Sequence, residues 1–293
     1  MIVRSLALVV ALAAFAAHGA AQSQTSPTQK PAASPGSRLT FEVASIKRNV
    51  SGDPNASIRI QPGGQMTVTN NSLYNLIRNA YGTQRFEMLP GANLPSWIDS
   101  DKWDILAKPP AGAPEVQEQM QLRLRSLLED RFKLVARREM REMPIYELVV
   151  VRTDGQLGKQ IKPSGDECAA QGRARAAGEQ PPPMPPGGFC GTRTGNGTVS
   201  MKGVPLSNFV RNLGGMTGRF VIDKTGLAGP YDLDLQWTPD PAAAGGPPQG
   251  APGPGDGASL FAAIQEQLGL KLEARRAPVE VLVIDSAERP TED

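Results

Sequence analysis

The phrase KLVARR at Lys133–Arg138 recurs as KLEARR at Lys271–Arg276, with one difference among the six positions. Soon after each phrase comes a proline and then an apolar run, IYELVV after Pro144 and VEVLVI after Pro278. Either the phrase is a functional motif that the chain uses twice, or it belongs to a structural unit that the chain carries twice.

The similarity between the two halves extends well upstream of this phrase. GQMTVTNNSLYNLIRNAYG (Gly64–Gly82) aligns without gaps on GTVSMKGVPLSNFVRNLGG (Gly197–Gly215). Apolar residues share the i, i+3, i+4, i+7 spacing of a buried helical face. They are Leu73, Leu76, Ile77 and Ala80 in the first half and Leu206, Phe209, Val210 and Leu213 in the second. The terminal glycines, Gly82 and Gly215, indicate that both helices stop there.

Three further elements follow in the same order in both halves. An apolar strand covers 102–108 and 230–236, and a second helix covers 115–132 and 259–268. The KL-x-ARR strand comes next, with a proline turn that opens a hairpin and leads to a final apolar strand. The pattern predicts an α+β fold made of two tandem copies of a strand–helix–strand–strand–helix–strand–strand module, with helices packed on mostly antiparallel sheets. A further strand at Thr40–Lys47 has no counterpart in the second half.

Composition divides the chain into modules and connecting segments. Stretches rich in proline, glycine and small residues predict linkers or loops. The expected organisation is a signal peptide at 1–21, a flexible linker at 22–39, a first module at 40–163, a Pro/Gly-rich insertion at 164–196 and a second module at 197–290 that contains a disordered loop at 239–258.

The amino-terminal residues predict export to the periplasm or the extracellular space. A positively charged start, an apolar run at Leu6–Ala17 and small residues after it are typical of a secretory signal peptide. We expect no transmembrane segment after signal cleavage. The only histidine, His18, lies in the signal, which removes Ser-His-Asp triads and histidine metal sites from the mature chain. The only cysteines, Cys168 and Cys190, are expected to form one disulfide in an oxidising compartment.

The charge balance and the repeated arginines suggest which ligands to expect. A formal net charge of +2 does not call for nucleic acid, and no motif predicts a metal or another cofactor. Arginines in and beside the repeated phrase form two basic patches that could bind an anionic ligand. The candidate residues are Arg137, Arg138, Arg141, Arg275 and Arg276. The alternative is that they flank a sheet edge and block edge pairing.

An enzyme remains the alternative to a binding protein. Glycoside hydrolysis needs only two carboxylates and no histidine, so it is compatible with this composition. The candidate acids are Asp104, Asp130, Glu139 and Glu142, which are equally well explained as solvated or ion-paired surface residues.

Several motifs together resemble a known family. FEVASIKRN (41–49), LLEDRFKLVARREMREMPIYELVVVR (127–152) and VIDKTGLAGPYDLDLQW (221–237) are similar to the soil-associated family of uncharacterised exported bacterial proteins, over residues 41–290. Similar domains occur attached to membrane sensor–metallopeptidases, so the resemblance implies an extracytoplasmic sensing role.

The second half also resembles, more distantly, the short amino-terminal module of secretins and TonB-dependent receptors. That resemblance lies in element order and implies contact with partner proteins without catalysis. We therefore expect a non-catalytic binding or sensing module of the bacterial envelope, with an envelope protein or an anionic ligand as partner. The alternative is an extracytoplasmic carboxylate-based hydrolase that acts on polysaccharide.

Overall fold

The computed structural model describes residues 38–113, 116–239 and 258–291. The predicted signal peptide, the linker as far as residue 37 and the interior of the loop at 239–258 lie outside these ranges. By its contacts, the chain from Leu39 onward is one unit. None of the helices in the described ranges is long and apolar enough to span a membrane.

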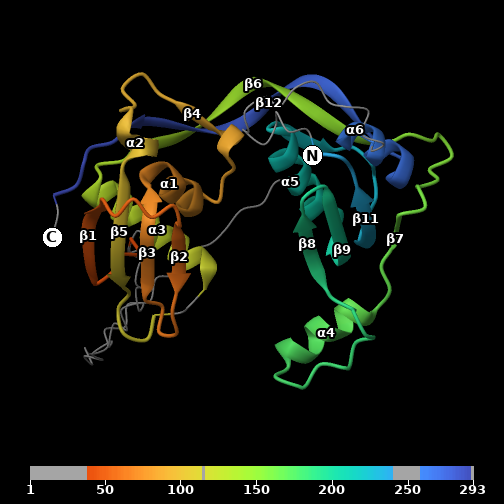
Figure 1. The fold of residues 1–293 in the computed structure, drawn as a ribbon, viewed down its shortest axis with the longest axis horizontal. Coiled ribbons are helices and arrows are strands. Elements are labelled where there is room, and N and C mark those ends of the chain that lie inside the picture. The colour runs from red at the N-terminus through yellow and green to blue at the C-terminus, as the bar shows by residue number, and fades with distance from the viewer. Residues whose placement is uncertain (1–37, 114–115, 240–257, 292–293) are drawn as a thin grey trace, which may run out of the picture. The chain divides into compact units, whose positions relative to one another are not determined.

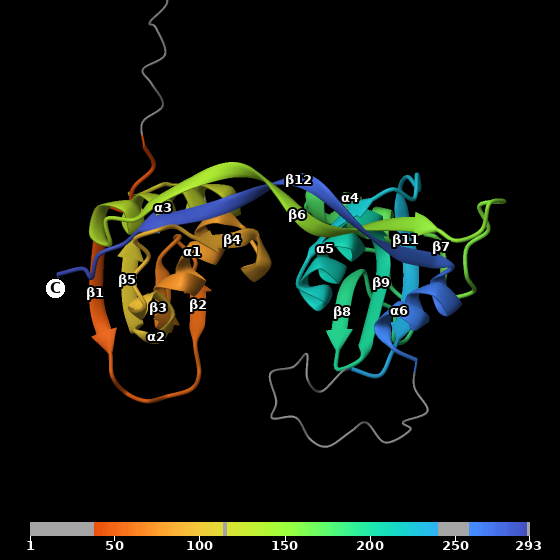
Figure 2. The same cartoon turned by 90° about the horizontal axis from the view of Figure 1, so that it is seen from above.

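Two long strands, β6 (Val135–Val150) and β12 (Leu270–Ser286), form an antiparallel ribbon. Figures 1 and 2 show them side by side from two directions. Two short strands pair with the ribbon in parallel, β10 (Phe220–Asp223) with β6 and β4 (Met88–Pro90) with β12. The resulting sheet has the order β10-β6-β12-β4.

The expected proline turns and hairpins are wrong. Each KL-x-ARR strand continues through its proline as one strand, so that Pro144 lies opposite Arg276 and Pro278 lies opposite Glu142. A strand tolerates proline where the missing N–H would have no ladder partner. The outer edges of the ribbon meet this condition at both prolines, because β10 pairs with β6 only from Ile145 onward and β4 pairs with β12 only from Leu282 onward.

Each half also contributes a four-stranded antiparallel sheet. The first, in spatial order, contains β1 (Val43–Asn49), β5 (Lys102–Lys108), β3 (Met66–Ser72) and β2 (Ser57–Ile60). The second contains β7 (Ile161–Pro163), β11 (Pro230–Gln236), β9 (Thr198–Pro205) and β8 (Gly191–Gly195). In the second sheet β7 lies at the edge beside β11, as β1 lies at the edge beside β5 in the first. The fold is therefore α+β, with three small and mostly antiparallel sheets.

Six α-helices occur in the described ranges. They are α1 (Leu73–Tyr81), α2 (Trp97–Ser100), α3 (Gln117–Arg131), α4 (Glu167–Ala176), α5 (Leu206–Thr217) and α6 (Leu260–Ala263). A 3₁₀ turn covers Arg85–Glu87, and a π-helical turn at Ile264–Leu268 continues α6. The Pro/Gly-rich insertion thus contains a helix and a strand, α4 and β8, where only a linker was expected.

Helices α1 and α5 bury the faces that the repeat predicts, except that Val210 of α5 is only partly buried. Ser72 caps α1 by accepting a hydrogen bond from the Asn75 backbone N–H (3.3 Å), and Gly82 ends it in a left-handed conformation (φ 63°). Helix α5 does not stop at Gly215 as expected but continues to Thr217, where Gly218 (φ 64°) supplies the left-handed cap. The helical Gly215 instead permits a close approach, because a Cβ there would lie 2.9 Å from the Gln84 Oε1 atom.

The ribbon carries a hydrophobic core at each of its ends. Leu134, just before β6, packs with Leu282 and Ile284 of β12 in the first core. Leu272 of β12 packs with Leu148 of β6 in the second core. Each KL-x-ARR leucine is therefore buried in the core of its own half, and the opposite strand contributes to the same core.

The two end sheets share one backbone irregularity. On β3, Asn70 has a positive φ of 52° beside a register shift, and its N–H donates to the Asp104 Oδ1 atom on β5 (2.8 Å). On β9, Gly203 has a φ of 65° beside a register shift, and its N–H donates to Asp232 Oδ1 on β11 (2.9 Å). In both sheets a carboxylate holds a β-bulge in place.

The burial of the two leucines gives the first prediction. Leu134→Ala and Leu272→Ala should each lower the free energy of unfolding by about 2–5 kcal/mol, because each leaves a cavity in a packed core. Val135→Ala is the control, since Val135 is 52% exposed and its truncation should change stability by less than about 0.5 kcal/mol. Urea unfolding measures all three, and equal effects at the buried and exposed positions would contradict the assignment of the cores.

Candidate functional site

The arginines of the repeated phrase join the two strands of the ribbon to each other. Arg137 on β6 donates from Nε to Asp285 Oδ2 on β12 (3.0 Å), and Arg275 on β12 forms an ion pair with Glu147 on β6 (Nε to Oε2, 3.6 Å). The same offset of 138 residues (271 − 133) relates Lys133 to Lys271, Arg137 to Arg275 and Glu147 to Asp285. The two ion pairs are therefore equivalent, and each copy of the phrase pairs with an acid on the other strand.

A second equivalent pair of contacts involves the next arginines. Arg138 forms a salt bridge with Glu280 across the ribbon, and Arg276 donates to the backbone carbonyl of Glu142 (3.2 Å). The offset of 138 residues (276 − 138) again relates Arg138 to Arg276 and Glu142 to Glu280.

The fifth candidate, Arg141, lies on β6 beside Glu139. Its Nε donates to Glu139 Oε1 (2.6 Å), and Arg137 also binds this carboxylate. The hydrogen bonds from Arg141 and Arg137 lower the pKa of Glu139. Four of the five candidate arginines thus contact a carboxylate and the fifth a carbonyl, and their binding of an anion stays a prediction.

The four candidate catalytic acids have different surroundings. Asp104 is held by the Asn49 side chain (2.9 and 3.0 Å) and by the Asn70 N–H, which gives it a role in the β-bulge. Glu139 lies between two arginines on the ribbon, on which Glu142 also lies. Asp130 lines a surface hollow of about 400 Å³, together with Glu42 and Arg131. Within the described ranges, no group of three or more His, Cys, Asp or Glu residues is placed to hold a metal ion.

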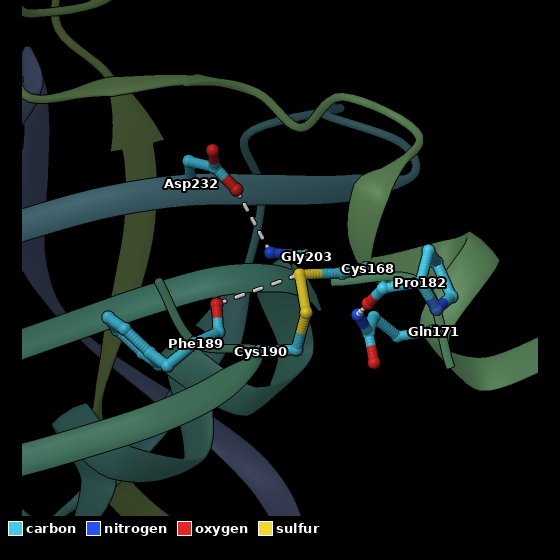
Figure 3. Close-up of a disulfide and its surroundings, with 7 residues drawn as sticks. All are labelled: Cys168, Gln171, Pro182, Phe189, Cys190, Gly203 and Asp232. Carbon is cyan, nitrogen blue, oxygen red and sulfur yellow. Dashed lines mark hydrogen bonds between the residues drawn. A yellow bond between two sulfur atoms is a disulfide. The ribbon is translucent and has the colours of Figure 1, made fainter. Parts of the chain in front are cut away.

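The disulfide joins Cys168 on α4 to Cys190, directly before β8. Figure 3 shows it beside Gly203 and Asp232, at the bulge of the second end sheet. A Cβ on Gly203 would lie 2.2 Å from the Cys168 Cβ atom, so the cysteine occupies the space that a side chain would need. The predicted pair is thus bonded, and it holds α4 against β9.

A surface hollow of about 500 Å³ lies where the ends of α1 and α5 approach each other. It is lined by Arg78, Gln84, Arg85, Phe86, Gly215 and Gly218. Gln84 Nε2 donates to the Arg211 carbonyl on α5 (2.9 Å), and the Arg211 guanidinium donates to the Gly82 carbonyl at the end of α1 (2.7 Å). These two hydrogen bonds hold the helix ends together beside the hollow.

A second hollow of about 570 Å³ shares Gly215 with the first. Its lining is mainly aromatic and apolar, and it consists of Tyr146, Gly215, Met216, Thr217, Arg219, Trp237, Thr238, Pro239, Ser259, Leu260 and Phe261. The rings of Tyr146 and Phe261 meet edge to face (centroids 5.4 Å apart), and the Arg219 guanidinium lies over Tyr146 (5.2 Å to the centroid). We call the two hollows together the arginine–aromatic groove.

Sequence reasoning missed this groove. Its arginines, Arg78, Arg85 and Arg219, and its aromatic residues come from segments far apart in the chain, and none belongs to a local motif. The one available signal was the similarity of the two halves, which matches Arg85 with Arg219 once the alignment is shifted by one residue after Gly82 and Gly215.

The exposed ion pairs of the ribbon give a second prediction. The double variant Arg137→Ala/Arg138→Ala, and the equivalent Arg275→Ala/Arg276→Ala, should keep a melting temperature close to that of the unmodified protein. The reason is that exposed ion pairs contribute little to stability. Differential scanning calorimetry measures this, and loss of the cooperative transition in either variant would show that the arginines are essential to the fold.

The crowding at Gly203 gives a third prediction. Gly203→Ala should destabilise the protein more than Gly226→Ala, although both positions have a positive φ (65° and 71°). The difference arises because Gly226 has no atom within 4 Å of its hypothetical Cβ, whereas Gly203 faces Cys168. Urea unfolding of both variants, with the disulfide intact, makes the comparison. An equal loss of unfolding free energy in the two variants would show that the contact with Cys168 does not affect stability.

Comparisons with known proteins place the chain in a family. A family model described as a protein of unknown function (DUF3738) matches residues 74–287. Searches of curated proteins and of solved structures find no significant match. Since the matched segment covers well over half of the sequence, the chain belongs to the DUF3738 family of proteins of unknown function.

Proposed function

We propose that this protein is an exported, non-catalytic binding or sensing module of the bacterial envelope, built from two copies of one α+β module. The arginine–aromatic groove is its binding site, and the ligand is an envelope protein or an anionic molecule. The observation that carries the proposal is the groove lining, which contains three arginines, three large aromatic side chains besides Phe86, and no acidic residue.

Four features support the duplication. The end sheets have the same strand order, their bulges are fixed by equivalent carboxylates, and the ion pairs of the ribbon are equivalent in both directions. In addition, the 138-residue offset also relates Arg141 to Val279 (279 − 141), and these two residues lie opposite each other in the ribbon. This register is what an antiparallel pairing of two equivalent strands produces.

The disulfide supports export. Structural disulfides form and persist in oxidising compartments, and both cysteines of this chain are joined in one bond. The resemblance to exported bacterial proteins and the amino-terminal signal pattern favour the same location.

The composition of the groove supports binding over catalysis. Small-ligand and peptide sites combine apolar and aromatic walls with a few placed polar groups. The groove has this composition, and its lining includes arginines but no acidic residue that could act as a general acid or base. One observation favours the enzymatic alternative, namely that Asp130 and Glu42 line the same 400 Å³ hollow. A hydrolase acting on polysaccharide through these two acids is therefore the second candidate.

The binding function is tested by crosslinking in the native envelope. A photoreactive phenylalanine analogue replaces Phe261, which is 45% exposed in the groove, or Leu106 on β5, which is 44% exposed outside it. We expect a discrete light-dependent adduct from position 261 and none from position 106.

The enzymatic alternative is measured on the same preparations. We expect no release of reducing ends from envelope polysaccharide, by the unmodified protein or by Asp130→Asn. Release that Asp130→Asn abolishes, with no adduct at position 261, would overturn the binding proposal in favour of the hydrolase.

A further inference from the structure

We infer, on the basis of the proposed binding function, that the arginine–aromatic groove binds an extended acidic peptide segment of a partner protein. A carboxylate of the peptide contacts Arg78 in the first hollow, and an aromatic or proline side chain packs in the second hollow against Tyr146, Trp237 and Phe261.

Arg78 is a partly buried cation of the groove with unused hydrogen-bond donors. It lies in the last turn of α1 and is partly buried, and its Nη1 atom is 3.4 Å from Asn75 Oδ1, at the limit of hydrogen bonding. Its Nε is buried without an acceptor, and no carboxylate in the described ranges forms an ion pair with it. The residue matched to it in the second half, Arg211, instead makes a 2.7 Å hydrogen bond to Gly82. Arg78 is thus left with donor capacity for an incoming carboxylate.

The other two arginines of the lining give the groove its charge. Arg85 is 3.1 Å from Asp99 and lies over the Tyr74 ring, so part of its charge is compensated. Arg219 is exposed, and its guanidinium lies over the face of Tyr146. No acidic side chain lines either hollow, so the groove presents a net positive surface. Charge complementarity therefore selects an acidic ligand.

The aromatic hollow accounts for the apolar part of the ligand. Tyr146 and Phe261 form a T-shaped pair, and Phe261 remains 45% exposed although it is large and apolar. Trp237 and Pro239 complete a wall of flat, rigid surfaces. Proline-containing and aromatic peptide segments bind to walls of this kind with little loss of side-chain freedom.

The passage between the hollows favours an extended chain. Gly215 is the residue common to both, and the nearby Gly218 has no atom within 4 Å of its hypothetical Cβ. The Gln84 side chain covers Gly215, since its Oε1 atom lies 2.9 Å from where a Cβ would be, so a peptide backbone would pass from one hollow to the other on the open side, over Gly218. The hollows, of about 500 and 570 Å³, are both open to solvent. A compact anion would occupy only one of them.

The test measures fluorescence anisotropy of a short fluorescein-labelled peptide that alternates Asp, Trp and Pro, with the full mature chain. The control peptide has Lys in place of each Asp. Arg78→Gln removes the cation at nearly constant shape, and Arg219→Gln, at an exposed position, is the second variant in case the first fails to fold. Arg152→Gln is the matched control, because Arg152 pairs with Asp154 (2.6 Å) and does not line the groove.

We expect saturable binding of the acidic peptide and weaker binding of the lysine peptide. Arg78→Gln and Arg219→Gln should each raise Kd about tenfold or more, since both remove a charge-assisted contact, whereas Arg152→Gln should leave Kd unchanged. Phe261→Ser should weaken binding of the acidic peptide to a similar extent.

Equal binding of the two peptides, or unchanged Kd in both folded arginine variants, would overturn the inference. If phenylacetate, tested as a small aromatic carboxylate, displaces the peptide at equal concentration, the ligand class is a small anion and the peptide assignment is wrong. In either case an adduct at position 261 would leave the proposed binding function standing. If that crosslink also fails, both the peptide inference and the proposed binding function are wrong.

Discussion

The antiparallel pairing of β6 with β12 is the interaction on which the rest of the structure depends. These strands are separated by more than a hundred residues, yet they pair from Ala136–Ile284 to Val150–Leu270. Each strand contributes to both hydrophobic cores, so neither half completes its core without the other. Sharing strands in this way compensates for the small core that a module of this size can build alone.

The pairing also answers why the KL-x-ARR phrase occurs twice. Its leucines belong to the cores, and its arginines contact the opposite strand, with Arg137 at Asp285 and Arg275 at Glu147. A residue change in one copy therefore acts on a partner encoded by the other half. The phrase therefore forms contacts across the ribbon, and its binding of an anion stays a prediction.

Much of the local structure could be predicted from the sequence, because it depends on local patterns. The buried face of α1, from Leu73 to Ala80, follows from helical periodicity, and its end at Gly82 follows from the conformational freedom of glycine. The Cys168–Cys190 bond follows from the cysteine count, together with the expectation that the chain is exported. Pairing across the ribbon could not be predicted, because Pro144 and Pro278 are turn signals unless the partner strand is known.

The groove escaped prediction for the same reason. Arg78 lines one hollow, and Arg219 and Phe261 line the other, which shares Gly215 with it. The two hollows adjoin because the ribbon and the contact between α1 and α5 bring distant segments to one surface. Helix α4 was hidden in a Pro/Gly-rich stretch, where the disulfide and the Asp166–Arg173 ion pair (2.8 Å) supply order that composition does not reveal. In both cases the information lies in long-range contacts and not in residue propensities.

The register of the ribbon is tested most directly by engineered disulfides. Met140 and Glu280 lie directly opposite each other, and both side chains are exposed. Cysteines at both positions should therefore form a disulfide within one chain under mild oxidation. Met140→Cys with Pro278→Cys is the control, since its diagonal spacing is too long for an unstrained bond. Peptide mapping by mass spectrometry under non-reducing conditions should find the 140–280 bond and little of the 140–278 bond. Equal yields of both, or a bond at 140–278 alone, would contradict the pairing on which this account rests.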